Sequence, residues 1–205
     1  MKTLLILVST IGVLSAQTIY KLTPGTKDNK IILTIENSSE ETNMSNINVV
    51  VNNNISAIKF HKLSRIIDEI KDCQSKEVEF AFDVDRIVDV NSTDTLNFLI
   101  SSKSGSWTKE ILIGYDLPKE FKLEQNYPNP FNPTTTIEFS LPKDGKYVIR
   151  VFNILGELVK VLADKNFEAG YHKIIFDAGR ISSGVYIYTL IGDDVNLIKK
   201  MIVLK

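Results

Sequence analysis

The side chains that could carry out chemistry are few and lie far apart along the chain. The sequence has two histidines, His61 and His172, and a single cysteine, Cys73. Histidine is the side chain that most readily transfers protons near neutral pH, and a cysteine becomes a nucleophile when its pKa is lowered by its surroundings. Cys73 has no histidine near it in the sequence, which favours an inert thiol. We expect His61 and His172 to lie in different domains, where they cannot form a metal-binding or acid–base pair.

The remaining candidates give weaker signals. Asp83, Asp85 and Asp89 in "FDVDRIVDV" could suggest calcium, but no glycine-bearing loop organises them, which favours solvated carboxylates on a strand and a turn. Trp107 in "SGSWTKE" could stack on a sugar or a peptide, although a lone tryptophan is more often a core anchor. The sequence has no zinc-protease, paired-cysteine, nucleophile-elbow or phosphate-loop motif. We therefore predict no catalytic, cofactor-binding or metal-binding residue, and a protein that is not an enzyme.

Composition excludes one class of partner and indicates the source of stability. The chain has 205 residues, of which 43% are hydrophobic, enough for one large domain or two small ones. Its 24 basic and 25 acidic side chains leave a formal net charge of -1, so we expect no nucleic acid as a partner. A lone cysteine cannot form an internal disulfide, so stability must come from a hydrophobic core.

The N-terminus is typical of a secretory signal peptide over residues 1–16. Lys2 supplies a positive charge, an aliphatic run follows from Leu4 to Leu14, and Ser15 and Ala16 are small residues suited to cleavage. The other reading of this pattern is a buried N-terminal strand. The run is shorter than the roughly 20 residues that a membrane helix needs, and we expect no membrane span in the mature protein.

Short alternating segments then predict strands over residues 18–115. In "KIILTIEN", Ile31, Leu33 and Ile35 fall on one face, and "VEFAFDV" alternates in the same way. Stretches rich in asparagine, serine and glycine separate the segments and favour turns. One stretch, "KLSRIIDEIKD", fits helical spacing, but its neighbours are all strand-like, and we favour an extended or one-turn segment over a helix. The pattern predicts a small β-sandwich domain.

A proline-rich stretch, "NYPNPFNP", interrupts this rhythm. Proline lacks a backbone donor and asparagine favours turns, so we interpret the stretch as a stiff entry into a second domain that blocks strand continuation from the first. We place a linker over residues 116–122 and the second domain over residues 123–205.

Strand signals are clearer in the second domain. "TTTIEFSLP" places Ile137, Phe139 and Leu141 inward. Asp144–Gly145 predicts a hairpin turn, and Gly156 marks a second turn before "ELVKVLAD". The segments that follow predict another small antiparallel sandwich, so the fold class is all-β with two small sandwiches in tandem.

Several landmarks of the second half occur together in a specific order. They are "NYPNPFNPTTTIEFSLP", "VFNILGELVKVL", "EAGYHKIIFDA", "SSGVYIYTL" and "IKKMIVLK". In this order, residues 123–205 resemble the type A C-terminal sorting domain of the type IX (Por) secretion system of the Bacteroidota. The resemblance implies an immunoglobulin-like form for this sandwich, and it makes residues 18–115 the cargo domain. The cargo domain resembles, more weakly and in general pattern only, the small immunoglobulin-like modules often found before such domains.

The resemblance implies an export route and its partners. It implies that the outer-membrane translocon of the type IX system recognises the folded domain in the periplasm, and that a C-terminal signal peptidase then removes it. The product is released or linked to surface lipopolysaccharide, so the expected location is secreted or on the outer cell surface. The residues that match the family's landmarks are the candidates for the sorting signal: Pro128, Asn129, Pro130, Gly156, Gly170, Gly184, Tyr186, Lys199, Lys200 and Lys205.

Two functions remain open for the first half. The first is a non-enzymatic binding or structural module carried outside by the sorting domain. The second is a small secreted enzyme or inhibitor with an unrecognised site, although a sandwich of this size rarely has a deep pocket. The partner of residues 18–115 is not defined by the sequence.

Overall fold

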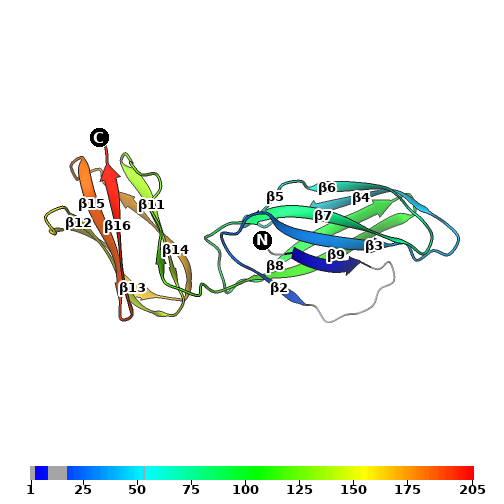
Figure 1. Cartoon of the computed structure of the whole chain (residues 1–205), viewed down its shortest axis with the longest axis horizontal. Helices are drawn as coiled ribbons and strands as arrows, with labels where there is room; N and C mark the ends of the chain where they lie inside the picture. The colour runs from blue at the N-terminus through cyan, green and yellow to red at the C-terminus, as the bar shows by residue number, and fades with distance from the viewer. Residues whose placement is uncertain (1–2, 9–17, 53) are drawn as a thin grey trace. The chain divides into compact units, whose positions relative to one another are not determined.

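The computed structural model describes residues 3–8, 18–52 and 54–205, and within them every regular element is a β-strand. The chain divides into two compact units, Met1–Asp116 and Leu117–Lys205. Each unit contains two sheets, whose strands are coloured from blue to red along the chain in Figure 1. The predicted all-β, immunoglobulin-like fold class is confirmed. Among the described residues, a helix that could span a lipid bilayer is not found.

The N-terminal unit is formed by two sheets that share one core. One sheet has the order β1-β3-β7-β5 and the other the order β2-β9-β8-β4-β6. Phe80 of one sheet and Phe98 of the other meet edge to face, with ring centroids 5.4 Å apart. Alternate residues are buried along the strands, as the period-two pattern predicts. The strands are β1 (Thr3–Val8), β2 (Ile19–Leu22), β3 (Asn29–Glu36), β4 (Met44–Asn52), β5 (Ile58–Phe60), β6 (Ser64–Ile70), β7 (Ser75–Val84), β8 (Asp94–Ser102) and β9 (Gly105–Tyr115).

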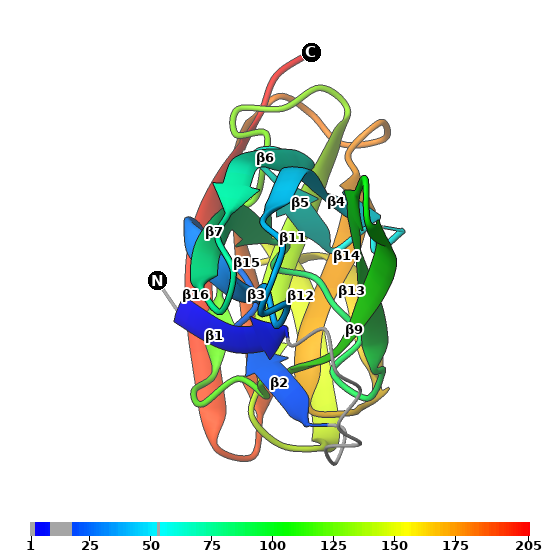
Figure 2. The ribbon, with the colours of Figure 1, turned by 90° about the vertical axis from the view of Figure 1, so that its right-hand side faces the viewer.

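The first strand overlaps the predicted signal peptide. Thr3–Val8 pairs in parallel with β3, from Thr3 opposite Lys30 to Val8 opposite Ile35. Figure 2 shows β1 at the margin of the unit. The other residues of the predicted segment, 1–2 and 9–16, lie outside the described part of the chain, and the signal peptide stays a prediction.

The stretch with helical spacing is a strand. Residues Ser64–Ile70 form β6, which pairs with β4, and bury Ile67 and Ile70. The preference for an extended conformation is therefore confirmed. Ile66 lies on the other side of the strand and is 73% exposed, so the apparent helical face is divided between the core and solvent.

The C-terminal unit also consists of two sheets around one core. Their orders are β10-β11-β14 and β13-β12-β15-β16. Phe139, Ile149 and Tyr188 are among the fully buried side chains between them. Figure 1 shows β11 and β14 facing β12, β15 and β16. The strands are β10 (Lys122–Leu123), β11 (Thr134–Leu141), β12 (Gly145–Asn153), β13 (Leu158–Phe167), β14 (Gly170–Asp177), β15 (Gly184–Gly192) and β16 (Val195–Val203).

The hairpin predicted at Asp144–Gly145 is wrong. Strand β11 pairs with β14, whereas β12 pairs with β13 and β15, so this connection crosses from one sheet to the other. The Asp144 carboxylate accepts a hydrogen bond from the Ala169 backbone at 2.6 Å, which joins this connection to the one between β13 and β14. The turn predicted at Gly156 does connect paired strands, β12 and β13, and Gly156 has a φ of 81°.

Candidate functional site

The proline-rich opening of the C-terminal unit is fastened to its last strand. We call residues 124–133 the strap. The backbone N–H of Phe131 donates to Ile202 at 3.1 Å, and the Phe131 carbonyl accepts from Leu204 at 2.9 Å. The Gln125 side-chain amide donates to the Lys200 carbonyl at 2.7 Å. The two ends of this unit, which lie far apart in sequence, therefore form one continuous site.

A cluster of buried polar groups joins the strap to β15 and β11. The hydroxyl of Tyr188, on β15, donates to the Glu124 carbonyl at 2.7 Å and accepts from the Asn126 backbone at 2.8 Å. The Asn126 side-chain amide donates to the Thr135 hydroxyl at 2.9 Å and to the Pro128 carbonyl at 3.0 Å. Asn126 is 1% exposed, so these bonds satisfy groups that would otherwise be costly to bury.

The strap is part of the domain rather than a stiff entry to it. The peptide bonds before Pro128, Pro130 and Pro133 are cis. Phe131 is 2% exposed and packs in the core with its ring centroid 6.0 Å from that of Phe176. The contacts of the chain divide after Asp116, and Phe121, within the predicted linker, already packs against the C-terminal core.

The predicted sorting residues fall into two groups, of which the first lies at the strap and β16. The Asn129 side-chain oxygen accepts from the Ile202 backbone at 2.9 Å, and Pro130 next to it is exposed. Lys199 and Lys200 are exposed on β16. Lys205 follows β16, and its Nζ donates to the Gly179 carbonyl at 3.2 Å. Pro128, described above, completes this group.

The second group has local structural tasks at turns and strand ends. Gly156 occupies the β12–β13 turn, while Gly170 and Gly184 begin β14 and β15. Tyr186 is buried, and its hydroxyl donates to the Ser182 carbonyl at 2.9 Å. Gly184 and Tyr186 lie on β15 opposite Val203 and Met201 of β16, so they border the first group, whereas Gly156 and Gly170 lie at other connections. Sequence reasoning missed Asn126, Phe131 and Tyr188, because their role depends on pairing between distant segments.

Alkaline pH is expected to weaken the C-terminal unit through Tyr188. Burial, followed by the nearby charge of Glu124, raises the pKa of Tyr188 to about 12. Because this pKa is higher in the folded state than the ordinary tyrosine value of about 10, the protonated hydroxyl contributes to the stability of the fold at pH values below about 10. This contribution to stability is lost as the pH rises from 10 towards 12. We expect the free energy of unfolding to fall by about 1–3 kcal/mol over this interval, measured by urea denaturation followed by circular dichroism.

Two variants isolate this effect. Tyr188→Phe should remove that part of the pH dependence, and at neutral pH it should cost about 1–3 kcal/mol because the Asn126 N–H loses its acceptor. Tyr127→Phe alters a ring that is 81% exposed and should keep the slope of the parent protein. An unchanged slope in Tyr188→Phe would contradict the assignment.

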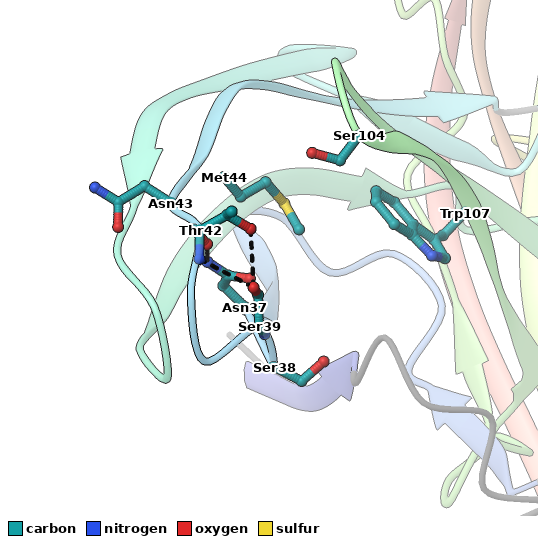
Figure 3. A pocket seen from close by; sticks show the side chains of 8 residues that line it. All are labelled: Asn37, Ser38, Ser39, Thr42, Asn43, Met44, Ser104 and Trp107. Atoms are coloured by element: carbon teal, nitrogen blue, oxygen red, sulfur yellow. Dashed lines mark hydrogen bonds between the residues drawn. The ribbon is translucent and has the colours of Figure 1, made fainter.

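The N-terminal unit has a cavity of about 300 Å³ at one end (Figure 3). Met44 and Trp107 form its apolar wall, and Trp107 is half-buried rather than a core anchor. The polar groups are already engaged: the Asn37 amide donates to the Thr42 carbonyl at 2.8 Å, and the hydroxyls of Ser39 and Thr42 lie 2.8 Å apart. The lining residues carry no acid, base or thiol: Asn37, Ser38, Ser39, Thr42, Asn43, Met44, Ser104 and Trp107.

One set of side chains in the described residues has metal-ligand chemistry. Asp28, His61 and Asp83 each offer one ligand atom, and these atoms lie within 4.8 Å of one another. His61 Nε2 lies 3.2 Å from Asp83 Oδ1. The Asp28 N–H donates to Asp83 at 2.9 Å and, together with His61, lowers the pKa of the Asp83 carboxyl. Sequence reasoning, which weighed Asp83 with Asp85 and Asp89, missed this grouping because the turn that brings Asp28 close is not local to β7.

Residues 125–204 match the sequence model of the family described as "Secretion system C-terminal sorting domain". The match includes almost the whole strap and continues through β16. The resemblance identified from the sequence is therefore confirmed for this part of the chain.

Solved structures resemble the chain only distantly. A CupB2 chaperone from Pseudomonas aeruginosa has a TM-score of 0.33 and 7% identity, over 88% of this chain and 96% of that one. Dimeric latent PorU from Porphyromonas gingivalis has a TM-score of 0.35 and 12% identity, over 92% of this chain and 19% of that one. The extracellular portion of mouse CD200RLa has a TM-score of 0.27 and 13% identity, over 92% of this chain and 100% of that one. No curated protein sequence matches.

Proposed function

We propose that this protein, whose C-terminal unit is a type IX secretion sorting domain, is a non-enzymatic exported protein with an N-terminal binding or structural module. The sorting domain directs export across the outer membrane, to the cell surface or to the surroundings. It thereby implies interaction with the type IX machinery and its C-terminal signal peptidase. The observation that carries the proposal is the family match over residues 125–204.

Geometry supports this role for the C-terminal unit. The first and last sequence landmarks of the family lie in the strap and on β16. Hydrogen bonds join these two segments, so both landmarks contribute to one surface. This surface forms only in a folded domain, because its contacts join distant segments. A receptor that binds it would therefore select folded chains.

Export of a truncated chain tests the proposal. The full chain and a chain ending at Asp116 are expressed in a bacterium with a working type IX system, and the cell fractions are analysed by intact mass. We expect the full chain outside the cell and the truncated chain retained in the periplasm. We expect the exported product to end near residues 118–123, and added lipopolysaccharide mass would identify an anchored form. Export of the truncated chain would overturn the proposal.

Binding, rather than catalysis, is the proposed role of the N-terminal unit. Its cavity has an aromatic and thioether wall and no titratable lining residue, which suits contact with an apolar or sugar face rather than acid–base chemistry. The polar lining groups are engaged in holding the loop between β3 and β4.

A small secreted enzyme is the second candidate function, and the His61–Asp83 pair is the observation that favours it. A histidine beside a carboxylate can act as a general base. Assays of the exported protein on peptidase and glycosidase substrates decide between the two, with His61→Ala and Cys73→Ala as variants. Activity that disappears in His61→Ala would replace the binding proposal.

A further inference from the structure

One surface of the sorting domain is unusually apolar. In antiparallel strands, residues paired directly across the ladder point to the same side of the sheet. Opposite the buried face of the β13-β12-β15-β16 sheet lies a second face, which we call the outer face. Its apolar members are Val148, Phe152, Leu158, Val161, Val185, Ile187, Ile191, Ile198 and Ile202. Leu158 and Ile198 are 55% and 60% exposed, and most of the others are half-buried by their neighbours.

The other sheet of the same domain provides the comparison. Its outward residues are mostly polar: Thr134 lies opposite Asp177, and Glu138 lies opposite Lys173. Such a face is normal for a sheet with one side in water. Ile175 is the exposed apolar exception, at 69%. A contiguous apolar face is rare on a protein that stays unpartnered, and marks an interaction surface.

Two buried polar atoms at the centre of the outer face have no hydrogen-bond partner. Arg150 on β12 lies opposite Thr189 on β15. Arg150 Nε and Thr189 Oγ1 are shielded from water without a hydrogen bond, and Thr189 is 6% exposed. Among the described residues, no carboxylate forms an ion pair with Arg150. Arg150 is half-buried, and its guanidinium can still donate to an acceptor supplied from outside.

We propose that the outer face docks on a protein of the secretion machinery, whose docking surface is apolar and presents a carboxylate to Arg150. The proposal rests on the sorting function proposed above. Charge argues against a second copy of this chain as the occupant, because a two-fold axis near the centre of the face would bring two Arg150 side chains together. The same face carries Lys200 and one carboxylate, Asp164, which is paired with Lys146 at 2.9 Å. Arg150 and Lys200 therefore leave the face with a positive charge, which favours an acidic partner.

Two isoleucines give a matched test in the full chain. Ile198→Glu places a charge on the outer face, and Ile175→Glu places the same charge at an equally exposed site on the other sheet. We expect Ile198→Glu to lower the exported fraction by about tenfold or more, with periplasmic accumulation, and Ile175→Glu to change it by less than about twofold. Arg150→Glu should resemble Ile198→Glu. Unchanged urea midpoints of the purified variants show that each chain still folds.

The outcomes separate this proposal from the one on which it rests. Retention of the chain ending at Asp116, together with normal export of Ile198→Glu, would overturn the docking surface while leaving the sorting function intact. Equal impairment by Ile175→Glu would also overturn it.

A photo-reactive residue at position 198 should cross-link to a protein of the secretion machinery, and a cross-linked dimer of this chain would identify a second copy instead. Flotation with phosphatidylethanolamine–phosphatidylglycerol vesicles that is lost in Ile198→Glu would identify a membrane instead.

Discussion

Replacing Phe131 with alanine is expected to lower the free energy of unfolding of the C-terminal unit by about 3–5 kcal/mol. Phe131 is 2% exposed, and its ring packs against Phe176 between the two sheets. Removal of the ring leaves a cavity that the surrounding strands cannot close, because the backbone of residue 131 stays bonded to Ile202 and Leu204. A loss of this size is a large share of the stability of a domain of this length.

The measurement uses urea denaturation followed by two signals. Circular dichroism reports both units, whereas the only tryptophan, Trp107, lies in the N-terminal unit and reports that unit alone. Phe131→Ala should move a circular-dichroism transition to lower urea and leave the fluorescence transition in place. Tyr127→Ala, an 81% exposed ring in the same strap, should change the free energy by less than about 0.5 kcal/mol. A wild-type circular-dichroism curve for Phe131→Ala would show that the strap is not part of the folded core.

Replacing Phe80 with alanine is expected to have the converse effect, a loss of about 3–5 kcal/mol confined to the N-terminal unit. Phe80 is fully buried and lies at the centre of an aromatic cluster, with ring centroids 6.3 Å from Phe60 and 5.4 Å from Phe98. Because Phe98 belongs to the opposite sheet, the lost ring removes contacts that join the two sheets.

Urea denaturation followed by the same two signals measures the stability of this variant. Trp107 fluorescence should shift to lower urea in Phe80→Ala, while the C-terminal transition seen by circular dichroism stays in place. Ile66→Ala, on the exposed side of β6, is the control and should leave both transitions unchanged. If Phe80→Ala moved both transitions together, the two units would unfold as one, and the proposed division into cargo and sorting domain would lose its thermodynamic basis.

The architecture was predictable from the sequence wherever one side of a strand is buried and the other is exposed to solvent. The alternation of Ile31, Leu33 and Ile35 gives β3 its inward face, and Ile137, Phe139 and Leu141 do the same for β11. Strand pairing was less predictable. Asp144–Gly145 has the composition of a hairpin turn, but the bond between Asp144 and Ala169 joins segments that no local pattern connects.

The candidate site was predictable in its parts but not in its assembly. The landmark residues of the strap and of β16 could be read from the sequence, whereas the bonds that join them depend on the folded domain. The outer face did leave a signal: "VYIYTLI" in β15 is apolar at nearly every position instead of alternating. Such a run fits a strand covered on both sides, and only the structure shows that one side is uncovered.

The fastening of the strap by residues 200–204 has a consequence for protein synthesis. A ribosome makes the strap well before it makes these residues, so the strap stays loose until Leu204 has emerged. A nascent chain that stalls or is cut short upstream of this point keeps the landmark sequence "NYPNPFNP" but cannot close it into the folded form. Such a chain would therefore lack the surface that the strap and β16 form together.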